Sequence, residues 1–187
     1  MKKGKIFIIS GPSGSGKTTL YKQLLASQNN LAKSISVTTR PQRPGEQHGR
    51  DYFFVSRKMF DYKKRAGHFL ESMKVFDNYY GTPKSYVYKL IRSGKNVLLC
   101  IDVKGAEVVR RKFPEAVSIF IKTPSLEVLR KRLTDRGSED QATVDLRIKT
   151  AKDELREAKS YNYVLINDSL QRCFAQLRGI ILHEITQ

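Results

Sequence analysis

The sequence predicts an α/β protein built on a doubly wound parallel sheet, and three observations lead to this fold class. Four short apolar runs have the composition of buried strands, a helical pattern follows each run, and 40% of the 187 residues are hydrophobic, which is enough for a sizeable core. Strands that alternate with helices indicate a parallel sheet covered by helices on both faces. Connections of this kind are almost always right-handed, so a doubly wound core follows.

The elements of this core come in a regular order along the chain. Ser125 and Ser169 immediately precede two of the helical patterns, where a serine hydroxyl can accept a hydrogen bond from a free backbone N–H. We expect strands at residues 5–10, 96–102, 116–122 and 163–167, each followed by a helix, at 17–26, 106–112, 126–135 and 170–184 respectively.

Residues 36–82 interrupt this alternation. They contain a loop rich in Pro, Gly and Arg, a short polar helix at about 58–66, and aromatic stretches that suggest short antiparallel strands. We therefore predict a single domain, residues 1–187, with its core at 1–35 and 83–187 and a small α+β insertion at 36–82. Residues 137–158 are rich in charged side chains and are expected to be solvated or mobile rather than part of the core.

The net charge of the chain is unusually positive. Thirty-five Lys and Arg against 18 Asp and Glu give +17, a balance that favours partners carrying phosphate, nucleic acid or anionic lipid. The charge is uneven, because the first 45 residues contain eight basic residues and no acidic one. That stretch is the first place to expect an anion site.

Other classes of protein fit the composition poorly. The two cysteines lie 73 positions apart and the three histidines lack zinc spacing, which argues against a disulfide framework or a zinc site. The apolar run near the N-terminus covers only four residues, too few for a secretory signal, and no run approaches the roughly 18 residues of a membrane span. We expect a cytoplasmic protein without a membrane partner.

The strongest motif is GPSGSGKT at residues 11–18, which matches GxxxxGK[ST] between a predicted strand and a predicted helix. Glycines let successive N–H groups face one anion at the positive end of the helix. Lys17 is expected to reach the β and γ phosphates of ATP, and Thr18 to ligate Mg²⁺. The alternative is a glycine-rich turn that binds nothing. The predicted ATP-binding set here is Gly11, Pro12, Ser13, Gly14, Ser15, Gly16, Lys17, Thr18 and Thr19.

A carboxylate ends the second predicted strand of the core. Asp102 stands where a side chain can face the metal of a nucleotide or a second substrate. An Asp at a strand end can equally cap the next turn. Beside the phosphate-binding motif, the functional interpretation is the stronger of the two.

Two arginines in the Pro-rich loop form a third candidate site. Arg40 and Arg43 are three residues apart, and Tyr52 and Tyr80 lie in the same insertion. Arginine binds phosphate through two N–H groups at once, and tyrosine hydroxyls can complete the oxygen shell. A solvated basic loop with core aromatics is the alternative for an isolated pair of arginines.

Further arginines lie toward the end of the chain. Arg132 and Arg136 are four residues apart on one helical face and lead into Gly137, a natural hinge, with Arg147 beyond it. We predict a lid at about residues 132–150 that closes these guanidinium groups over a transferring phosphoryl group. Ordinary surface charge is the alternative, and it is the preferred interpretation for Arg130.

Taken together, these motifs resemble those of the guanylate kinases. The resemblance runs from SGPSGSGKTTL (10–20) through SVTTRPQRPGEQHGRDYFFV (36–55), GHFLE (67–71), NYYGTP (78–83), IDVKGA (101–106) and RLTDRG (132–137) to YNYVLIND (161–168). It implies a P-loop NTPase-type fold with a nucleoside monophosphate-binding insertion and a lid. It also implies transfer of the γ-phosphoryl group of ATP to GMP or dGMP, Mg²⁺ as cofactor, no nucleic-acid partner, and a monomer or homodimer.

The same resemblance implies roles for individual residues. Glu71 can accept the paired N1–H and N2–H₂ donors of guanine, which adenine lacks. Cys100 stands where the family commonly has an acid, so weaker metal affinity is expected. The implied GMP site comprises Ser36, Arg40, Arg43, Tyr52, Glu71, Tyr80, Thr82 and Asp102; Arg136 and Asn167 join the ATP site; and the implied catalytic residues are Lys17, Arg40, Arg132, Arg136 and Arg147.

Two alternatives of other classes remain. Domains of this fold also serve as non-catalytic modules that bind phosphorylated peptides, but such modules typically lose residues equivalent to Lys17, Arg136 or Arg147. A nucleic-acid binder would place its basic residues on one face with stacking aromatics, whereas here the arginines lie in the nucleotide motifs. No general base is apparent, and none is needed, because a phosphate monoester with a second pKa of about 6 is already anionic at neutral pH.

Overall fold

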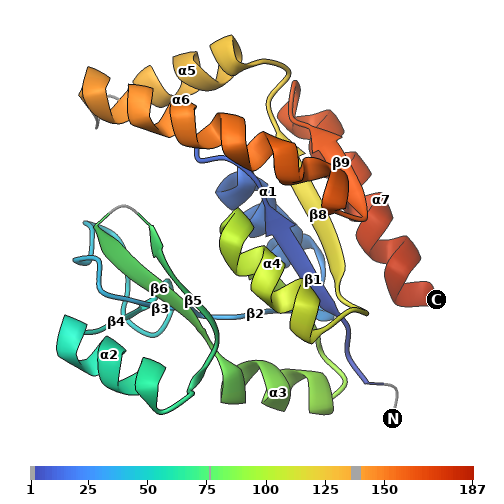
Figure 1. Ribbon diagram of the computed structural model, residues 1–187. Helices are drawn as coiled ribbons and strands as arrows, with labels where there is room; N and C mark the ends of the chain where they lie inside the picture. Colours follow the sequence, from blue (N-terminus) through green and yellow to red (C-terminus); the bar gives the residue numbers. More distant parts are fainter. Residues whose placement is uncertain (1–2, 76, 136–139) are drawn as a thin grey trace.

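A computed structural model describes residues 3–75, 77–135 and 140–187 (Figure 1). Its central sheet has five strands in the order β2-β7-β1-β8-β9, and all four strand pairs are parallel. The predicted α/β class is therefore confirmed. The strands are β1 (Ile6–Ser10), β2 (Leu31–Lys33), β7 (Asn96–Cys100), β8 (Val117–Lys122) and β9 (Tyr163–Ile166).

Helices cover both faces of this sheet because successive side chains of a strand point to opposite sides. Phe7 and Ile9 of β1 pack in one apolar cluster with α1 (Lys17–Ser27) and α7 (Leu170–Thr186). Ile6 and Ile8 pack in a second cluster with helices on the other face. That face carries α3 (Lys84–Arg92), α4 (Val103–Lys112) and the 3₁₀ turn η1 (Glu157–Ser160).

A second, four-stranded sheet lies beside the core in the order β4-β3-β6-β5 (Figure 1). Its helix α2 packs on it through Phe60, whose ring stacks 4.8 Å from that of Phe69. The expected antiparallel pairing holds for β3–β6 and β5–β6, but β3 and β4 are parallel because a long loop between them returns the chain to the same edge. The elements are β3 (Val37–Thr38), β4 (Phe53–Phe54), α2 (Arg57–Arg65), β5 (Phe69–Val75) and β6 (Asn78–Pro83).

The helices α5 (Leu126–Thr134) and α6 (Gln141–Arg156) pack against each other above the sheet (Figure 1). The expectation of a solvated or mobile segment is wrong for the described part of 137–158. Three apolar residues at helical spacing lie hidden among its charges and join α5 in a third cluster. The buried members of this cluster are Leu129, Leu133, Val144, Ile148 and Ala151.

Local signals place the helix starts. Ser125 caps α5, since its Oγ accepts from the N–H of Val128 at 3.3 Å. Ser169 stands at the N-cap of α7 as expected, but its side chain makes no capping bond there. The helix α4 begins three residues earlier than expected, because Asp102 caps it. The short strand β2 and the helix α3 are elements that the apolar runs did not predict.

Candidate active site

The phosphate loop, residues 11–18, joins β1 to α1 at the centre of the main sheet. Gly11 has φ +134°, and a Cβ atom there would lie 2.1 Å from the carbonyl oxygen of Ile121 on β8. Gly16 has φ +95°, and its Cβ would lie 2.2 Å from Nδ2 of Asn167. Only glycine fits both the conformation and the space at these two positions. The loop is thus packed directly against its neighbours on two sides.

Lys17 and Thr18 begin the helix that follows the loop. The Lys17 ammonium donates hydrogen bonds to the carbonyl oxygens of Gly11 at 2.6 Å and Pro12 at 2.8 Å, which holds its charge over the mouth of the loop. Thr18 is exposed in the first turn of α1, so its hydroxyl is accessible to a ligand. Thr19, the last residue of the predicted ATP set, is exposed beside it.

Asn167 supports the phosphate loop from the opposite end of the chain. Its side chain is buried at 3% exposure and donates from Nδ2 to the carbonyl oxygen of Ser15 at 2.8 Å. Its backbone N–H donates to the carbonyl oxygen of Lys122 at 2.7 Å. The resemblance placed Asn167 in the ATP site; the contact seen here is to the loop itself, and a direct contact with ATP stays a prediction.

Two of the three predicted lid arginines lie at the rim of the loop. Arg147 of α6 donates from Nη1 to Oγ of Ser13 at 2.6 Å, and Arg132 of α5 donates from Nη2 to the carbonyl oxygen of Asn167 at 2.8 Å. Arg136 lies outside the described residues. The structure therefore brings Arg132 and Arg147, which are 15 positions apart, to one end of the main sheet.

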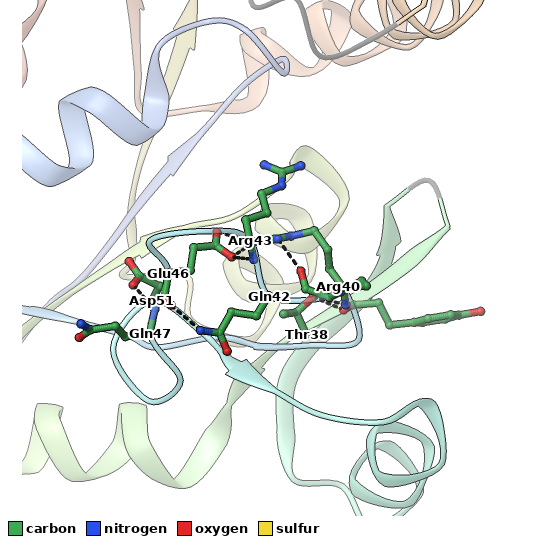
Figure 2. A network of polar contacts seen from close by, with 9 residues as sticks. Thr38, Arg40, Gln42, Arg43, Glu46, Gln47 and Asp51 are labelled. Carbon is green, nitrogen blue, oxygen red and sulfur yellow. Dashed lines mark hydrogen bonds and ion pairs between the residues drawn. The ribbon is translucent and has the colours of Figure 1, made fainter.

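The insertion presents its arginines from the loop between β3 and β4, residues 39–52, which we call the arginine loop. Nη2 of Arg40 donates to both carboxylate oxygens of Glu46, at 2.6 and 2.9 Å, and the backbone N–H of Arg43 donates to the same carboxylate at 2.9 Å (Figure 2). These bonds hold the pKa of Glu46 below its usual value. Figure 2 shows the exposed guanidinium of Arg43 pointing away from Glu46.

Aromatic rings surround the Arg40 guanidinium. Its central carbon lies 5.4 Å from the ring centroid of Tyr52 and 5.8 Å from that of Phe54. The rings of Tyr52 and Tyr80 meet edge to face at 6.0 Å, and burial raises the pKa of Tyr52 to about 12. Arg40, Tyr52 and Tyr80 thus form one group. Glu46 was not predicted; the available signal was its place as the first acid of the chain, three residues after Arg43.

Glu71 lies at the inner end of the insertion sheet, where it meets α4. It is 6% exposed, and its Oε1 accepts a hydrogen bond from Oγ1 of Thr82 at 2.6 Å. Burial raises the pKa of this carboxyl to about 7, and the nearby charge of Asp102 acts in the same direction. A Cβ atom on Gly105 of α4 would lie 2.9 Å from Oε2, so this glycine gives Glu71 its space. Ser36 is half-buried just before β3.

Asp102 interacts electrostatically with Lys17 of the phosphate loop and with Glu71 of the insertion. It follows the carboxyl end of β7, directly beside β1, and its Oδ1 accepts from the N–H of Gly105 at 2.7 Å. The capping role that the sequence left open is therefore present. Burial raises the pKa of Asp102 in spite of this bond.

Among the described residues, no group of three or more His, Cys, Asp or Glu side chains is arranged to hold a metal ion by itself. Burial also raises the pKa of Cys100, so its thiol is neutral. A site at Thr18 would thus depend on oxygen atoms of a nucleotide and of water. No helix in the described ranges is long and apolar enough to cross a membrane.

Comparison with known proteins agrees with this geometry. The family model described as "Guanylate kinase" matches residues 3–184. The chain belongs to the guanylate kinase family. It is 44% identical to a guanylate kinase of Symbiobacterium thermophilum, over 97% of this chain and 86% of that one, and 46% identical to one of Caldanaerobacter subterraneus, over 98% and 89%.

A solved guanylate kinase structure has the same fold. The crystal structure from Anaplasma phagocytophilum is 33% identical and superposes with a TM-score of 0.83, covering all of this chain and 88% of that one. The resemblance predicted from the motifs is confirmed, and so is the P-loop NTPase-type fold that it implied. Guanylate kinase membership also makes the chain an enzyme, a phosphotransferase.

Proposed function

We propose that this chain transfers the γ-phosphoryl group of ATP to GMP, giving ADP and GDP, and that dGMP is also an acceptor. The observation that carries the proposal is the buried Glu71–Thr82 pair at the inner end of the insertion. A carboxylate there can accept the N1–H and N2–H₂ donors of guanine in parallel. An adenine would leave the buried carboxylate without these donors, and such a loss is costly.

The phosphate loop is proposed to hold ATP. Its backbone N–H groups and the start of α1 favour the β and γ phosphates. Lys17 would exchange its two carbonyl partners for phosphate oxygens, a short movement for a long side chain. Arg132, Arg136 and Arg147 would then neutralise charge on the transferring group, which is where a kinase gains most of its rate.

Thr18 is the residue we propose to hold Mg²⁺, together with phosphate oxygens and water. Mg²⁺ prefers oxygen ligands, keeps several waters and is commonly bound with substrate phosphates, which suits a site with one exposed hydroxyl. When bound, the ion would neutralise phosphate charge and orient the γ-phosphoryl group. The neutral thiol of Cys100 adds no charge to this site, in line with the expected weaker metal affinity.

The arginine loop is proposed to hold the phosphate of GMP. Arg40 and Arg43 would bind it with the hydroxyls of Tyr52 and Tyr80, while Ser36, Glu71 and Thr82 bind the base and Asp102 lies close to the bound nucleotide. For Arg40 the phosphate would compete with Glu46, whose two oxygens both accept from Nη2. The attacking phosphate oxygen needs no base, so these residues act by alignment.

Movement of the insertion (36–82) and of the lid (about 132–150) is proposed to bring the two sites together. Two polyanions must meet without water between them, because water would otherwise accept the phosphoryl group. The described part of the lid already reaches the phosphate loop through Arg147 and Ser13.

A coupled assay of ADP formation tests the proposal. ATP should be consumed with GMP and more slowly with dGMP, and hardly at all with AMP. Equal rates with AMP and GMP, or no rate with GMP, would overturn it.

We also propose a cytoplasmic location, where ATP and GMP are available, and a monomer or homodimer in solution. Light scattering on the purified chain would distinguish these two states, and a larger assembly would contradict both.

A further inference from the structure

One acidic side chain near the phosphate loop has no part in the function proposed above. Glu154 lies on α6, seven residues after Arg147, which is two helical turns along the same face. Arg147 donates to Ser13 of the loop, and Ala151, halfway between the two, is buried. Glu154 is half-buried and lies on the same face of α6 as Arg147.

The charged neighbours of Glu154 come from three other elements. They are Lys17 at the start of α1, Asp102 at the end of β7 and Lys104 in the first turn of α4. Burial raises the pKa of Glu154 to about 7, which reflects a carboxyl removed from water next to a second carboxyl. Two acidic groups thus approach the place where β1 ends.

Two buried hydroxyls complete this group. Ser10, the last residue of β1, is fully buried, and Tyr161 is 7% exposed. The two hydroxyls lie next to each other, but neither makes a hydrogen bond of good geometry. Tyr161 also interacts with the charges of Asp102 and Glu154. We call Ser10, Asp102, Glu154 and Tyr161 the strand-end cluster.

The charge of the strand-end cluster is unfavourable for binding phosphate alone. Carboxylates beside a triphosphate repel it, and burial strengthens the repulsion. A hydrated divalent cation between them reverses the sign, because its waters donate hydrogen bonds to carboxylates and hydroxyls while the ion attracts both anions. Buried hydroxyls without good partners are also what a set of bound waters would satisfy.

We propose that Glu154 is a further positioning residue of the donor site, which with Asp102 accepts hydrogen bonds from the water shell of the metal ion that accompanies ATP. This inference rests on the proposed function, since it requires Mg²⁺·ATP as the ligand of the phosphate loop. Lys104, the exposed cation beside both carboxylates, would keep the pair together before the nucleotide arrives.

The test is the Glu154→Gln variant of the full chain, titrated with ATP by calorimetry in EDTA and then with Mg²⁺ in the presence of ATP. Removal of the acid should leave the affinity for metal-free ATP unchanged or raise it a few-fold. The affinity of the ATP complex for Mg²⁺ should fall about tenfold. The matched control is Asp153→Asn, an exposed acid next in the chain that pairs with Arg156 and should change neither affinity.

A structural defect would weaken the binding of both ligands, whereas the proposed role lowers only the affinity for Mg²⁺. If Glu154→Gln weakens metal-free ATP and Mg²⁺ alike, or leaves Mg²⁺ affinity unchanged, the proposal is wrong. Should the variant fail to fold, Tyr161→Phe, which removes one hydroxyl of the cluster, should lower Mg²⁺ affinity a few-fold without weakening metal-free ATP. Wild-type protein that binds Mg²⁺·ATP but does not phosphorylate GMP would overturn the proposed function and leave this inference standing.

Discussion

The phosphate loop and the arginine loop are both proposed to bind phosphate, but they are held in different ways. The phosphate loop offers backbone N–H groups and is fixed by β1, β8 and Asn167 at the centre of the buried sheet. The arginine loop offers side chains and connects two strands of two residues each. We therefore expect the phosphate loop to change less than the arginine loop when a ligand binds.

The ion pair between Glu46 and Arg40 is one example of this difference. Without a ligand, the Arg40 guanidinium is already neutralised by a carboxylate of its own loop. The Lys17 ammonium donates to two neutral carbonyl oxygens, and it also interacts with the charges of Asp102 and Glu154. We therefore expect ATP to compete with carbonyl oxygens for the donors of Lys17, and GMP to compete with a carboxylate of the same loop for those of Arg40.

The largest effect should come from removing the charge of the phosphate loop. Lys17→Met should lower kcat for GMP phosphorylation by at least about 10²–10³-fold, because a donor to the transferring group is lost. The free energy of unfolding should change by less than about 0.5 kcal/mol. Steady-state kinetics and thermal unfolding measure the two quantities. Lys22→Met, an exposed lysine of the same helix, is the control, and retained turnover in Lys17→Met would mean that the loop is not the catalytic site.

A pair of glycine variants compares the rigidity of the two loops. Gly16→Ala forces a Cβ against Asn167, whereas Gly45→Ala in the arginine loop has a similar φ, +81°, and nothing within 4 Å. We expect Gly16→Ala to weaken ATP binding by about 10²-fold, because a small displacement of a positioned group is costly. Gly45→Ala should cost only about 1 kcal/mol of stability. Unchanged ATP affinity in Gly16→Ala would show that the close approach to Asn167 does not position the phosphate loop.

Glu71→Gln tests base recognition in the insertion. The loss of a charged acceptor for two guanine donors should raise KM for GMP about 10- to 100-fold. KM for ATP should change less than about threefold, since the donor site is held by other elements. The ratio of the two KM values is the measurement, and parallel rises in both would indicate a general structural defect.

The raised pKa of Glu71 should make GMP binding depend on pH in a way that ATP binding does not. With its pKa at about 7, Glu71 is mainly protonated below pH 7 and must lose that proton to accept the guanine donors. GMP affinity should therefore fall as the pH is lowered from 8 to 6, approaching tenfold per pH unit. In Glu71→Gln, only the ionisation of the GMP phosphate near pH 6 should remain. A wild-type profile identical to that of the variant would rule out this role.

The smallest effect should come from Glu46→Gln. The amide can still accept from the N–H of Arg43, but it no longer neutralises Arg40. GMP should bind about two- to fivefold more tightly at low salt, and the gain should shrink as salt screens the freed charge. Fluorescence or calorimetric titration at two salt concentrations measures it. Asp51→Asn, a half-buried acid of the same loop whose amide can still accept from the N–H of Gln47, serves as control, and weaker GMP binding in Glu46→Gln would show that the ion pair orders the site.

The parts of the fold that could be predicted are those marked by residues close together in the sequence. The apolar run before Ser10 and the glycines after it determine a strand, a turn and a helix within about 25 residues, so both fold and loop could be predicted. The short strand β2 was missed because it has three residues, one of them a lysine, and so carries little apolar signal. Helix α3 was missed because only Val87 and Ile91 of its residues are buried.

The partners within the site were harder to predict. Glu46 and Glu154 look like ordinary surface acids in the sequence, and their contacts with Arg40 and with the strand-end cluster exist only after folding. The boundaries of the insertion and of the lid stay predictions, since they concern movement. The effect of an acidic residue on a bound phosphate depends on its neighbours in the folded protein, which the sequence does not show.

The bond between Asn167 and Ser15 joins positions 152 residues apart. A ribosome therefore completes the first strand, its loop and α1 long before the residue that braces the loop has been made. Until β9 is added beside β8, the nascent chain has the phosphate-binding motif without its support. We expect nucleotide affinity to appear only late in synthesis, once Asn167 can reach the loop.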